Sequence, residues 1–287
     1  MKTEIELTKG KHGTKAIIKS EWRNHYYEIL TDNHVVELEL NDSKGWKGDC
    51  IDFIRHFSHI KSLTLIDMNI KNIQSINELY NLEDLSLITY SKNSVDFSNF
   101  PKLTTLDFEW INGSTSLFDL KHIQDLSINR YSDKNLELFS KLTSLNRLSL
   151  MNSRINSLDN ICQLTNLNSL SLINLTKVEN CSCLSNLTNL EDITIHSCKK
   201  ISDISPLFSL QKIKKMHILD MGIIQSISGI EVMTNLKEFL FYESTNIIDG
   251  DLIGLTKLPN IEKVIFQNRK HYTHKREEFV CATKQFK

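Results

Sequence analysis

Six cysteines and ten histidines are the side chains of this 287-residue sequence that could bind a metal or take part in catalysis. Cys181 and Cys183 are separated by one residue, and Cys162 and Cys198 flank them. Thiolates are good zinc ligands, but C-x-C is not the usual zinc spacing, and no histidine pair follows it in order. We therefore expect these cysteines to be buried in turns, and we expect neither a metal nor a cofactor.

Two histidines could form an acid–base pair. His196 and His217 occupy equivalent regions of successive sequence repeats, so their imidazoles could touch and exchange protons. The ordinary interpretation is that both are surface polar residues. The sequence contains no G-x-S-x-G, P-loop, G-x-G-x-x-G or H-E-x-x-H motif. It thus predicts a protein that is not an enzyme, with a site at the histidines or the cysteines as the alternative.

The elements that would position these side chains are set by a repeated apolar pattern. A triplet of the form apolar-x-x-apolar-x-apolar returns about every 22 residues, which indicates stacked repeats that bury one common core. We number its apolar residues as positions 1, 4 and 6. The eleven triplets are Val35/Leu38/Leu40, Ile60/Leu63/Leu65, Leu82/Leu85/Leu87, Leu103/Leu106/Phe108, Ile123/Leu126/Ile128, Leu145/Leu148/Leu150, Leu167/Leu170/Leu172, Leu190/Ile193/Ile195, Ile213/Met216/Ile218, Leu236/Phe239/Phe241 and Ile261/Val264/Phe266.

The repeats divide the chain into three segments. Residues 1–34 precede the first triplet and predict two short strands and a helix with Ser20 as its N-cap. A solenoid needs its first apolar layer covered, so we interpret this segment as an N-terminal cap. Residues 35–268 contain the repeats, and the basic residues 269–287 form a C-terminal cap or tail.

The pattern resembles the leucine-rich-repeat family, L-x-x-L-x-L-x-x-N-x-L. The repeat length and the segment 201–210 are most similar to the bacterial internalin type. The resemblance implies an α/β repeat solenoid, a horseshoe or arc with a concave parallel sheet and a convex side of short 3₁₀ or extended segments. The usual asparagine of position 9 is largely replaced, so other groups must satisfy the backbone of the turns. The residues there are Met68, Tyr90, Ile111, Tyr131, Ser153, Leu175, Cys198, Met221 and Ser244.

In this family, positions 3, 5 and 7 point out from the concave sheet and form its binding face. Acidic residues occupy these positions in the first five repeats, with no lysine or arginine among them. Neighbouring strands are about 4.8 Å apart, so the fields of these carboxylates add and would steer a basic partner. The alternative is a solvated charged face. The acidic candidates are Glu37, Glu39, Asp84, Asp107, Glu109 and Asp125.

Apolar side chains interrupt the same face and could supply the centre of an interface. We expect these apolar side chains to face solvent unless other segments of the chain cover them. They include Ile66, Ile88, Leu219 and Leu240. The remaining candidate partner-binding residues are Trp110, Met151, Ile173, His196, His217 and Tyr242.

Composition excludes several other classes of function. The net charge is −1, from 34 basic and 35 acidic residues, so no overall attraction to nucleic acid or membrane is expected. No apolar run is long enough to span a bilayer, and the start lacks the apolar core of a secretory signal. We therefore expect a cytoplasmic protein, and its high asparagine, isoleucine and lysine usage suggests a bacterial source.

Together these features predict a non-enzymatic protein–protein interaction module that binds its partner on the concave face. One version is an inhibitor or immunity protein that neutralises a basic toxin, which the acidic residues motivate. The alternative is a secreted or injected bacterial effector that binds a host protein.

Overall fold

The structure, a computed structural model, describes residues 4–280. Its contacts divide the chain into two compact units, residues 1–128 and 129–287. Each unit is a stack of repeats in which a short strand is followed by a turn, a 3₁₀ segment and a return to the next strand. No helix within the described residues is both long and apolar enough to cross a bilayer.

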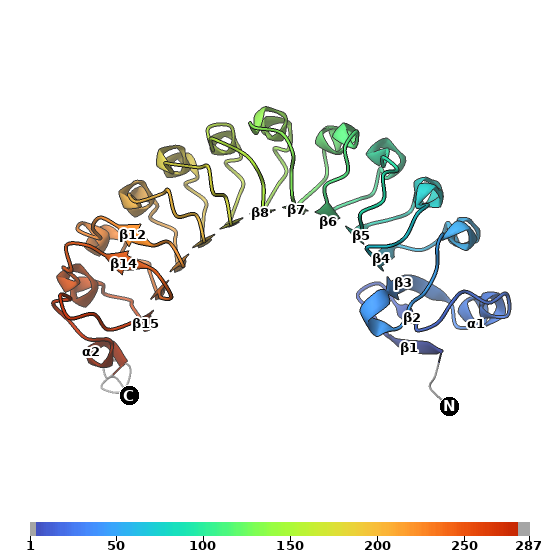
Figure 1. Cartoon of the computed structure of the whole chain (residues 1–287), viewed down its shortest axis with the longest axis horizontal. Coiled ribbons are helices and arrows are strands. Elements are labelled where there is room, and N and C mark those ends of the chain that lie inside the picture. The colour runs from blue at the N-terminus through green and yellow to red at the C-terminus, as the bar shows by residue number, and fades with distance from the viewer. Residues whose placement is uncertain (1–3, 281–287) are drawn as a thin grey trace. The chain divides into compact units, whose positions relative to one another are not determined.

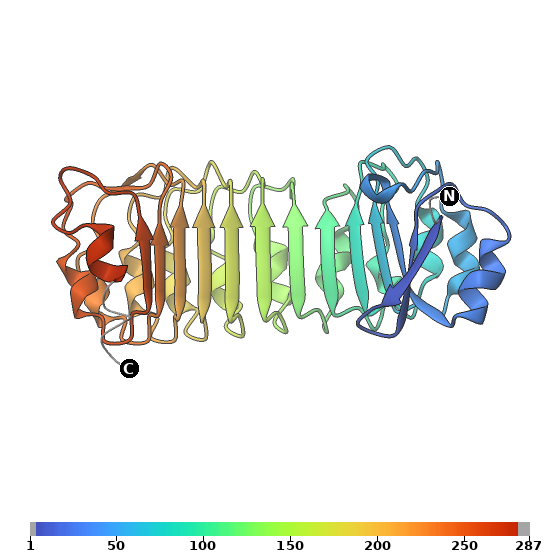
Figure 2. The same ribbon diagram turned by 90° about the horizontal axis from the view of Figure 1, so that it is seen from below.

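The first unit begins with a hairpin and continues as a parallel sheet. β1 is antiparallel to β2, whereas β2 to β6 pair in parallel in chain order, as the arrows of Figure 2 show. A short helix, α1 (Tyr26–Asp32), joins β2 to β3. The strands are β1 (Ile5–Lys9), β2 (Thr14–Ile18), β3 (Val35–Asn41), β4 (Ser62–Ile66), β5 (Asp84–Ile88), β6 (Thr105–Glu109) and β7 (Asp125–Asn129).

The second unit repeats the same parallel arrangement. Its strand order is β8-β9-β10-β11-β13-β15, and β12 and β14 form a separate two-stranded sheet. The strands are β8 (Arg147–Met151), β9 (Ser169–Ile173), β10 (Asp192–His196), β11 (Lys215–Leu219), β12 (Ile223–Ile224), β13 (Glu238–Phe241), β14 (Asn246–Ile247) and β15 (Lys263–Phe266). Helix α2 (Arg276–Val280) follows the last strand.

Within each unit, short 3₁₀ helices lie on the side of the repeat opposite the strands (Figure 1). The second repeat shows why the sequence forms a 3₁₀ helix here. Apolar residues recur at every third position, and all three of them, Ile73, Ile76 and Leu79, are buried. A 3₁₀ helix has three residues per turn, so this spacing keeps them on one face. The 3₁₀ helices are Asp42–Lys44, Asp52–Phe57, Gln74–Glu78, Phe97–Asn99, Thr115–Asp119, Glu137–Lys141, Ile161–Gln163, Ser182–Asn186, Ser205–Ser209, Ile230–Val232 and Ile253–Lys257.

The core of each unit is built from the predicted triplets. In β9, Leu170 and Leu172 are buried, whereas Ser169, Ser171 and Ile173 between and beside them are half-exposed. Side chains alternate across a strand, so positions 4 and 6 face the interior and positions 3, 5 and 7 the other side. Each fully buried leucine contributes about 1.5–3 kcal/mol of transfer free energy.

In the turns after β7, β8, β9, β10, β11 and β13, the residue at position 8 has a left-handed conformation. Asn152, Asn174 and Ser197 have φ angles of 51°, 54° and 55°. The backbone N–H of Asn152 donates to the carbonyl of Ile173 at 2.9 Å, and that of Asn174 to the carbonyl of His196 at 2.8 Å. Each turn is thus hydrogen-bonded to the next repeat through its backbone.

Hydroxyl groups take over part of the role of the missing asparagines at position 9. The hydroxyl of Ser153 donates to the carbonyl of Met151 at 2.9 Å and accepts from the N–H of Tyr131 at 3.1 Å. The hydroxyl of Thr245 likewise donates to the carbonyl of Ile218 at 2.9 Å and accepts from the N–H of Met221 at 3.0 Å. These bonds confirm the expectation that other groups satisfy the turn backbone.

Aromatic side chains cover both ends of the described chain. Trp22 stacks on Phe53 with ring centroids 3.8 Å apart, whereas Tyr272 and Phe279 lie 5.8 and 5.9 Å from Phe266. The predicted N-cap was wrong, because α1 begins at Tyr26 and the Ser20 hydroxyl instead bonds the Tyr26 hydroxyl at 2.6 Å. Residues 281–287 of the predicted tail lie outside the described residues.

Candidate functional site

The sheet face, meaning the side of each sheet that carries positions 3, 5 and 7, is where sequence reasoning placed the site. In the first unit, Asp84 and Asp107 lie on this face as predicted and are half-buried. Asp125 on β7 is half-buried too. The carboxylate of Asp107 accepts a hydrogen bond from the hydroxyl of Ser86, on the neighbouring strand, at 3.3 Å.

The acids of β3 are not open to solvent, contrary to the prediction. Glu37 and Glu39 are only 5% and 4% exposed. The turn between β1 and β2 folds over them, and the backbone N–H of His12 donates to the Glu37 carboxylate. Lys15 and Lys44 approach Glu39 to 2.7 and 2.6 Å.

The same turn reaches Asp84 on β5. Lys11 Nζ lies 2.8 Å from Asp84 Oδ1, and His12 Nε2 lies 2.5 Å from Asp84 Oδ2. Burial opposes ionisation of Asp84, but the hydrogen bonds from Lys11 and His12 outweigh it, so its pKa is below the ordinary value. The β1–β2 hairpin therefore occupies three of the acids that were expected to attract a partner. It pairs with Glu39 and Asp84 through basic side chains and bonds Glu37 through a backbone N–H.

Glu109, the last residue of β6, also differs from its predicted exposure, whereas Trp110 directly after it does not. Glu109 is buried, with 3% of its surface exposed. The ring of Trp110 lies 6.0 Å from that of Phe108 and 6.1 Å from that of Phe118, both of which are core residues. Trp110 is half-exposed, with its ring against these two core rings, and its role as an anchor stays a prediction.

The second unit carries a continuous apolar stripe on its sheet face. Strand register places Met151 beside Ile173, Ile173 beside His196, and His196 beside Leu219. All four are half-exposed, as is Tyr242 in the following repeat. We call these five residues the apolar stripe. Leu240, which was also expected to face solvent, is only 8% exposed, and that expectation was wrong.

A polar row lies next to the apolar stripe. Ser149, Ser171 and Thr194 follow one another in register on β8, β9 and β10, and His217 continues the row on β11. His217 Nε2 lies 2.8 Å from Glu238 Oε1. The binding candidates of this unit therefore form two parallel rows, one apolar and one polar.

The two histidines do not form the acid–base pair that was considered. The register aligns His217 with Thr194 and His196 with Leu219, so the imidazoles lie in different rows. His217 pairs with Glu238, and His196 Nε2 lies 3.5 Å from Glu243 Oε2. Each imidazole thus has its own carboxylate, an arrangement that does not support direct proton exchange between them.

Of the four cysteines expected to be buried, Cys181 and Cys198 are buried, whereas Cys162 and Cys183 are half-exposed. Burial raises the pKa of Cys181 and Cys183 to about 12 and that of Cys198 to about 11. The thiol of Cys183 donates to the carbonyl of Leu158 at 3.0 Å. At neutral pH these thiols are protonated and are poor nucleophiles or metal ligands.

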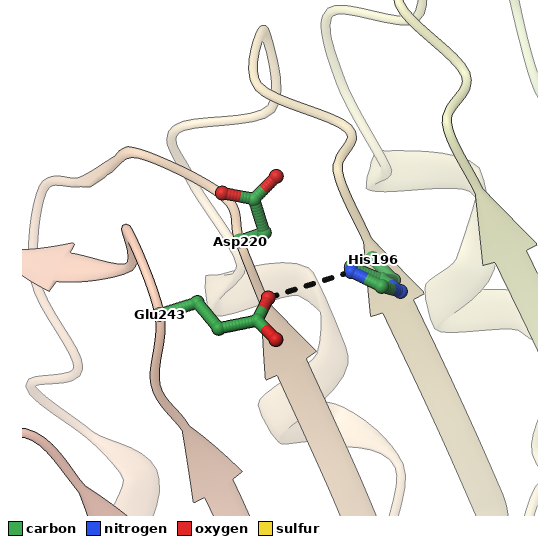
Figure 3. A group of neighbouring side chains, drawn as sticks. All are labelled: His196, Asp220 and Glu243. Carbon is green, nitrogen blue, oxygen red and sulfur yellow. Dashed lines mark ion pairs between the residues drawn. The ribbon is translucent and has the colours of Figure 1, made fainter.

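A third group of ionisable residues was missed by sequence reasoning. His196, Asp220 and Glu243 each place one ligand atom within 4.8 Å of the others (Figure 3). Hydrogen bonds from Ser244 and Ser197 outweigh a small effect of burial and hold the pKa of Asp220 at about 2. The signal in the sequence was their common location at positions 7 and 8 of three successive repeats.

Solved structures similar to this one are leucine-rich-repeat proteins. An internalin (inlF) from Listeria monocytogenes matches with a TM-score of 0.55 at 22% identity, over 76% of this chain and 71% of that chain. Internalin C2 (inlC2) of the same organism matches with a TM-score of 0.52 at 24% identity, over 73% and 82%. The functional domain of InlJ from this organism matches with a TM-score of 0.57 at 16% identity, over 77% and 48%.

No family model matches the sequence, and neither does any curated protein. The chain has a leucine-rich-repeat fold. The structural neighbours, the parallel strands and the 3₁₀ returns together confirm the predicted solenoid and its likeness to the internalin type at the level of fold.

Proposed function

We propose that this chain is a non-enzymatic protein-binding module whose partner docks on the apolar stripe of the second unit. The observation that carries the proposal is the unbroken register of Met151, Ile173, His196 and Leu219 on four adjacent strands. With strands about 4.8 Å apart, the row extends over about 14 Å, and Tyr242 extends it by one repeat. Half-exposed Met, aromatic and aliphatic groups are typical of the centre of a protein interface.

The rigidity of the stripe favours binding. Its side chains project from hydrogen-bonded strands whose opposite faces are fixed by buried leucines such as Leu170 and Leu172. A preformed surface loses little conformational entropy when a partner binds, so more of the burial energy appears as affinity. The adjacent row of Ser149, Ser171 and Thr194 supplies hydroxyls that a partner's backbone can bond at the margin.

The charge distribution does not favour the more specific version, an inhibitor of a basic toxin. Of the acids that motivated it, Asp84 is paired with Lys11 and Glu39 with Lys15, and Glu37 is buried and accepts from the backbone N–H of His12. The partner chemistry that the stripe favours is apolar. We retain the cytoplasm as the proposed compartment, with an exported effector as the alternative. Fractionation of the native host distinguishes them, since an effector would be recovered outside the cell.

An affinity-capture experiment with paired variants tests the proposed surface. Ile173→Asp places a charge in the middle of the apolar stripe, so we expect at least about tenfold weaker capture of the native partner, the effect of burying an unpaired charge. Ile88→Asp is the matched control, because Ile88 occupies the same position 7, on β5, and is half-exposed too.

Quantitative mass spectrometry of proteins captured from the native host would give the result. A protein that is retained by wild type and Ile88→Asp but lost with Ile173→Asp supports the proposal. A partner lost only with Ile88→Asp would move the interface to the first unit. A partner retained by both variants would exclude both the apolar stripe and the surface around Ile88 as its docking site.

A further inference from the structure

We propose that His196, Asp220 and Glu243 form a binding site for a divalent transition-metal ion of the Zn²⁺ or Mn²⁺ class. One potential ligand atom of each residue lies within 4.8 Å of the other two (Figure 3). Three atoms that close can reach one ion with bonds of about 2.0–2.2 Å after small side-chain rotations. The inference is independent of the protein-binding proposal.

The repeat geometry explains why these residues converge. His196 occupies position 7 as the last residue of β10, and Asp220 and Glu243 occupy position 8 of the next two repeats. Asp220 and Glu243 have left-handed φ angles of 47° and 62°. In preceding repeats, residues with this conformation direct their side chains toward the previous turn, as the amide of Asn174 does when it donates to Asn152 at 2.7 Å. Glu243 follows this direction and reaches His196, with Oε2 and Nε2 3.5 Å apart.

Hydroxyl groups orient Asp220 beside the other two residues. Ser244 donates to Asp220 Oδ1 at 2.5 Å, and Ser197 donates to Oδ2 at 2.8 Å. Such bonds from outside a coordination shell fix the direction of a ligand and strengthen metal binding. A carboxylate has about four acceptor positions, so two hydroxyl bonds leave lone pairs for an ion.

Among the contacts of the described residues, the basic side chain that pairs with Asp220 is an exposed lysine. Lys199 Nζ lies 3.2 Å from Asp220 Oδ2, and its side chain is 59% exposed. A surface ion pair of this kind is worth about 0–1 kcal/mol, so a divalent ion can displace it at little cost. Two carboxylates within 4.8 Å of each other also gain more from a doubly charged ion than from one lysine.

The donor set selects the class of metal. One imidazole and two carboxylates suit Zn²⁺, Mn²⁺ or Co²⁺, whereas Ca²⁺ takes six to eight oxygen ligands and Mg²⁺ retains most of its waters. Three protein ligands leave at least one position for water. Because His196 also belongs to the apolar stripe, a group of a docked protein could take that position.

A nearby histidine provides a matched comparison. His217 pairs with Glu238 at 2.8 Å, but the third group beside Glu238 is the ammonium of Lys263, at 3.2 Å, rather than a second carboxylate. The two sites thus share a histidine–carboxylate pair and differ in the charge of the third member. A selective metal should bind at His196 and not at His217.

The experiment uses the whole reduced protein and two metals as probes. Zn²⁺ is added in steps during NMR of the ¹⁵N-labelled histidine rings, because direct coordination changes the chemical shift of the ring nitrogen that binds the ion. We expect a large shift for a ring nitrogen of His196 at metal concentrations that leave the ring nitrogens of His217 near their metal-free positions. Calorimetric titration with Zn²⁺ then gives the affinity, and Mg²⁺ serves as the non-binding comparison.

Variants test whether His196 and Glu243 are responsible for the heat of Zn²⁺ binding. We expect Glu243→Gln, which preserves side-chain shape, to weaken Zn²⁺ binding at least about tenfold, and His217→Ala to leave it unchanged. Circular dichroism confirms that each variant is folded. Equal shifts of the ring nitrogens of both histidines, or Zn²⁺ binding unaltered by both Glu243→Gln and His196→Ala, would overturn the proposal.

Discussion

The position of a residue within the repeat decides what its ionisable side chain can do. Cys198, at position 9, faces the interior, where burial raises its pKa to about 11. Asp220, one position earlier in its own repeat, lies in a turn where hydroxyl donors hold its pKa near 2. Two residues in equivalent turns thus have pKa shifts of opposite direction, because one side chain is buried and the other accepts hydrogen bonds that stabilise its charge.

Thiol reactivity should follow this distinction. At pH 8, a thiol with a pKa near 11 is ionised in about one molecule per thousand, so Cys198 should resist alkylation. Cys50 is exposed and should react first. Mass spectrometry after brief iodoacetamide treatment should find Cys50 modified and Cys181 and Cys198 intact until denaturant is added. Early modification of Cys198 in the folded protein would contradict its burial.

At the scale of elements, the spacing of the triplets predicted the strands but not what covers them. Leu85 and Leu87 are buried within β5, as alternation in a strand requires. The basic turn of the β1–β2 hairpin could not be placed over the sheet face, because Lys11 and Asp84 are 73 residues apart in sequence. The periodicity of a sequence predicts which face of the sheet a side chain lies on, whereas a contact between distant segments depends on tertiary folding.

The hairpin should contribute stability that depends on pH. The pKa of Asp84 is depressed in the folded state, so its contribution is complete above the ordinary value near 3.8 and is lost as pH falls through the folded pKa. We expect Asp84→Asn to reduce the free energy of unfolding by about 1–3 kcal/mol at pH 7 and to have little effect at pH 2. Urea titrations at both pH values measure this.

Tryptophan fluorescence suits that measurement, because all three tryptophans, Trp22, Trp46 and Trp110, belong to the first unit. Asp107→Asn is the control, since Asp107 lies on the neighbouring strand and accepts from the neutral hydroxyl of Ser86. We expect Asp107→Asn to reduce the free energy of unfolding by less than Asp84→Asn does. Equal losses for both variants would show that the hairpin contacts add nothing specific.

At the scale of the whole molecule, a repeat protein is stabilised by contacts between neighbours, so its ends need special protection. The sequence predicts caps at residues 1–34 and 269–287, because the apolar layers of the first and last repeats must be covered. The aromatic contacts of Trp22 with Phe53 and of Tyr272 with Phe266 fit that interpretation, which remains a prediction. The sequence could not specify which ring meets which layer, because many apolar side chains satisfy the same need.

Removing one C-terminal ring tests whether this segment acts as a cap. Phe279 is buried against Phe266, so Phe279→Ala should cost about 3 kcal/mol locally, the range for truncating a buried aromatic side chain. Hydrogen exchange should accelerate most in β15 and β13 and progressively less toward β8, because each repeat is stabilised by its neighbours. Lys270→Ala, an exposed position in the same segment, should leave exchange unchanged. A uniform acceleration through β8 to β15 would instead indicate one cooperative unit with no distinct cap.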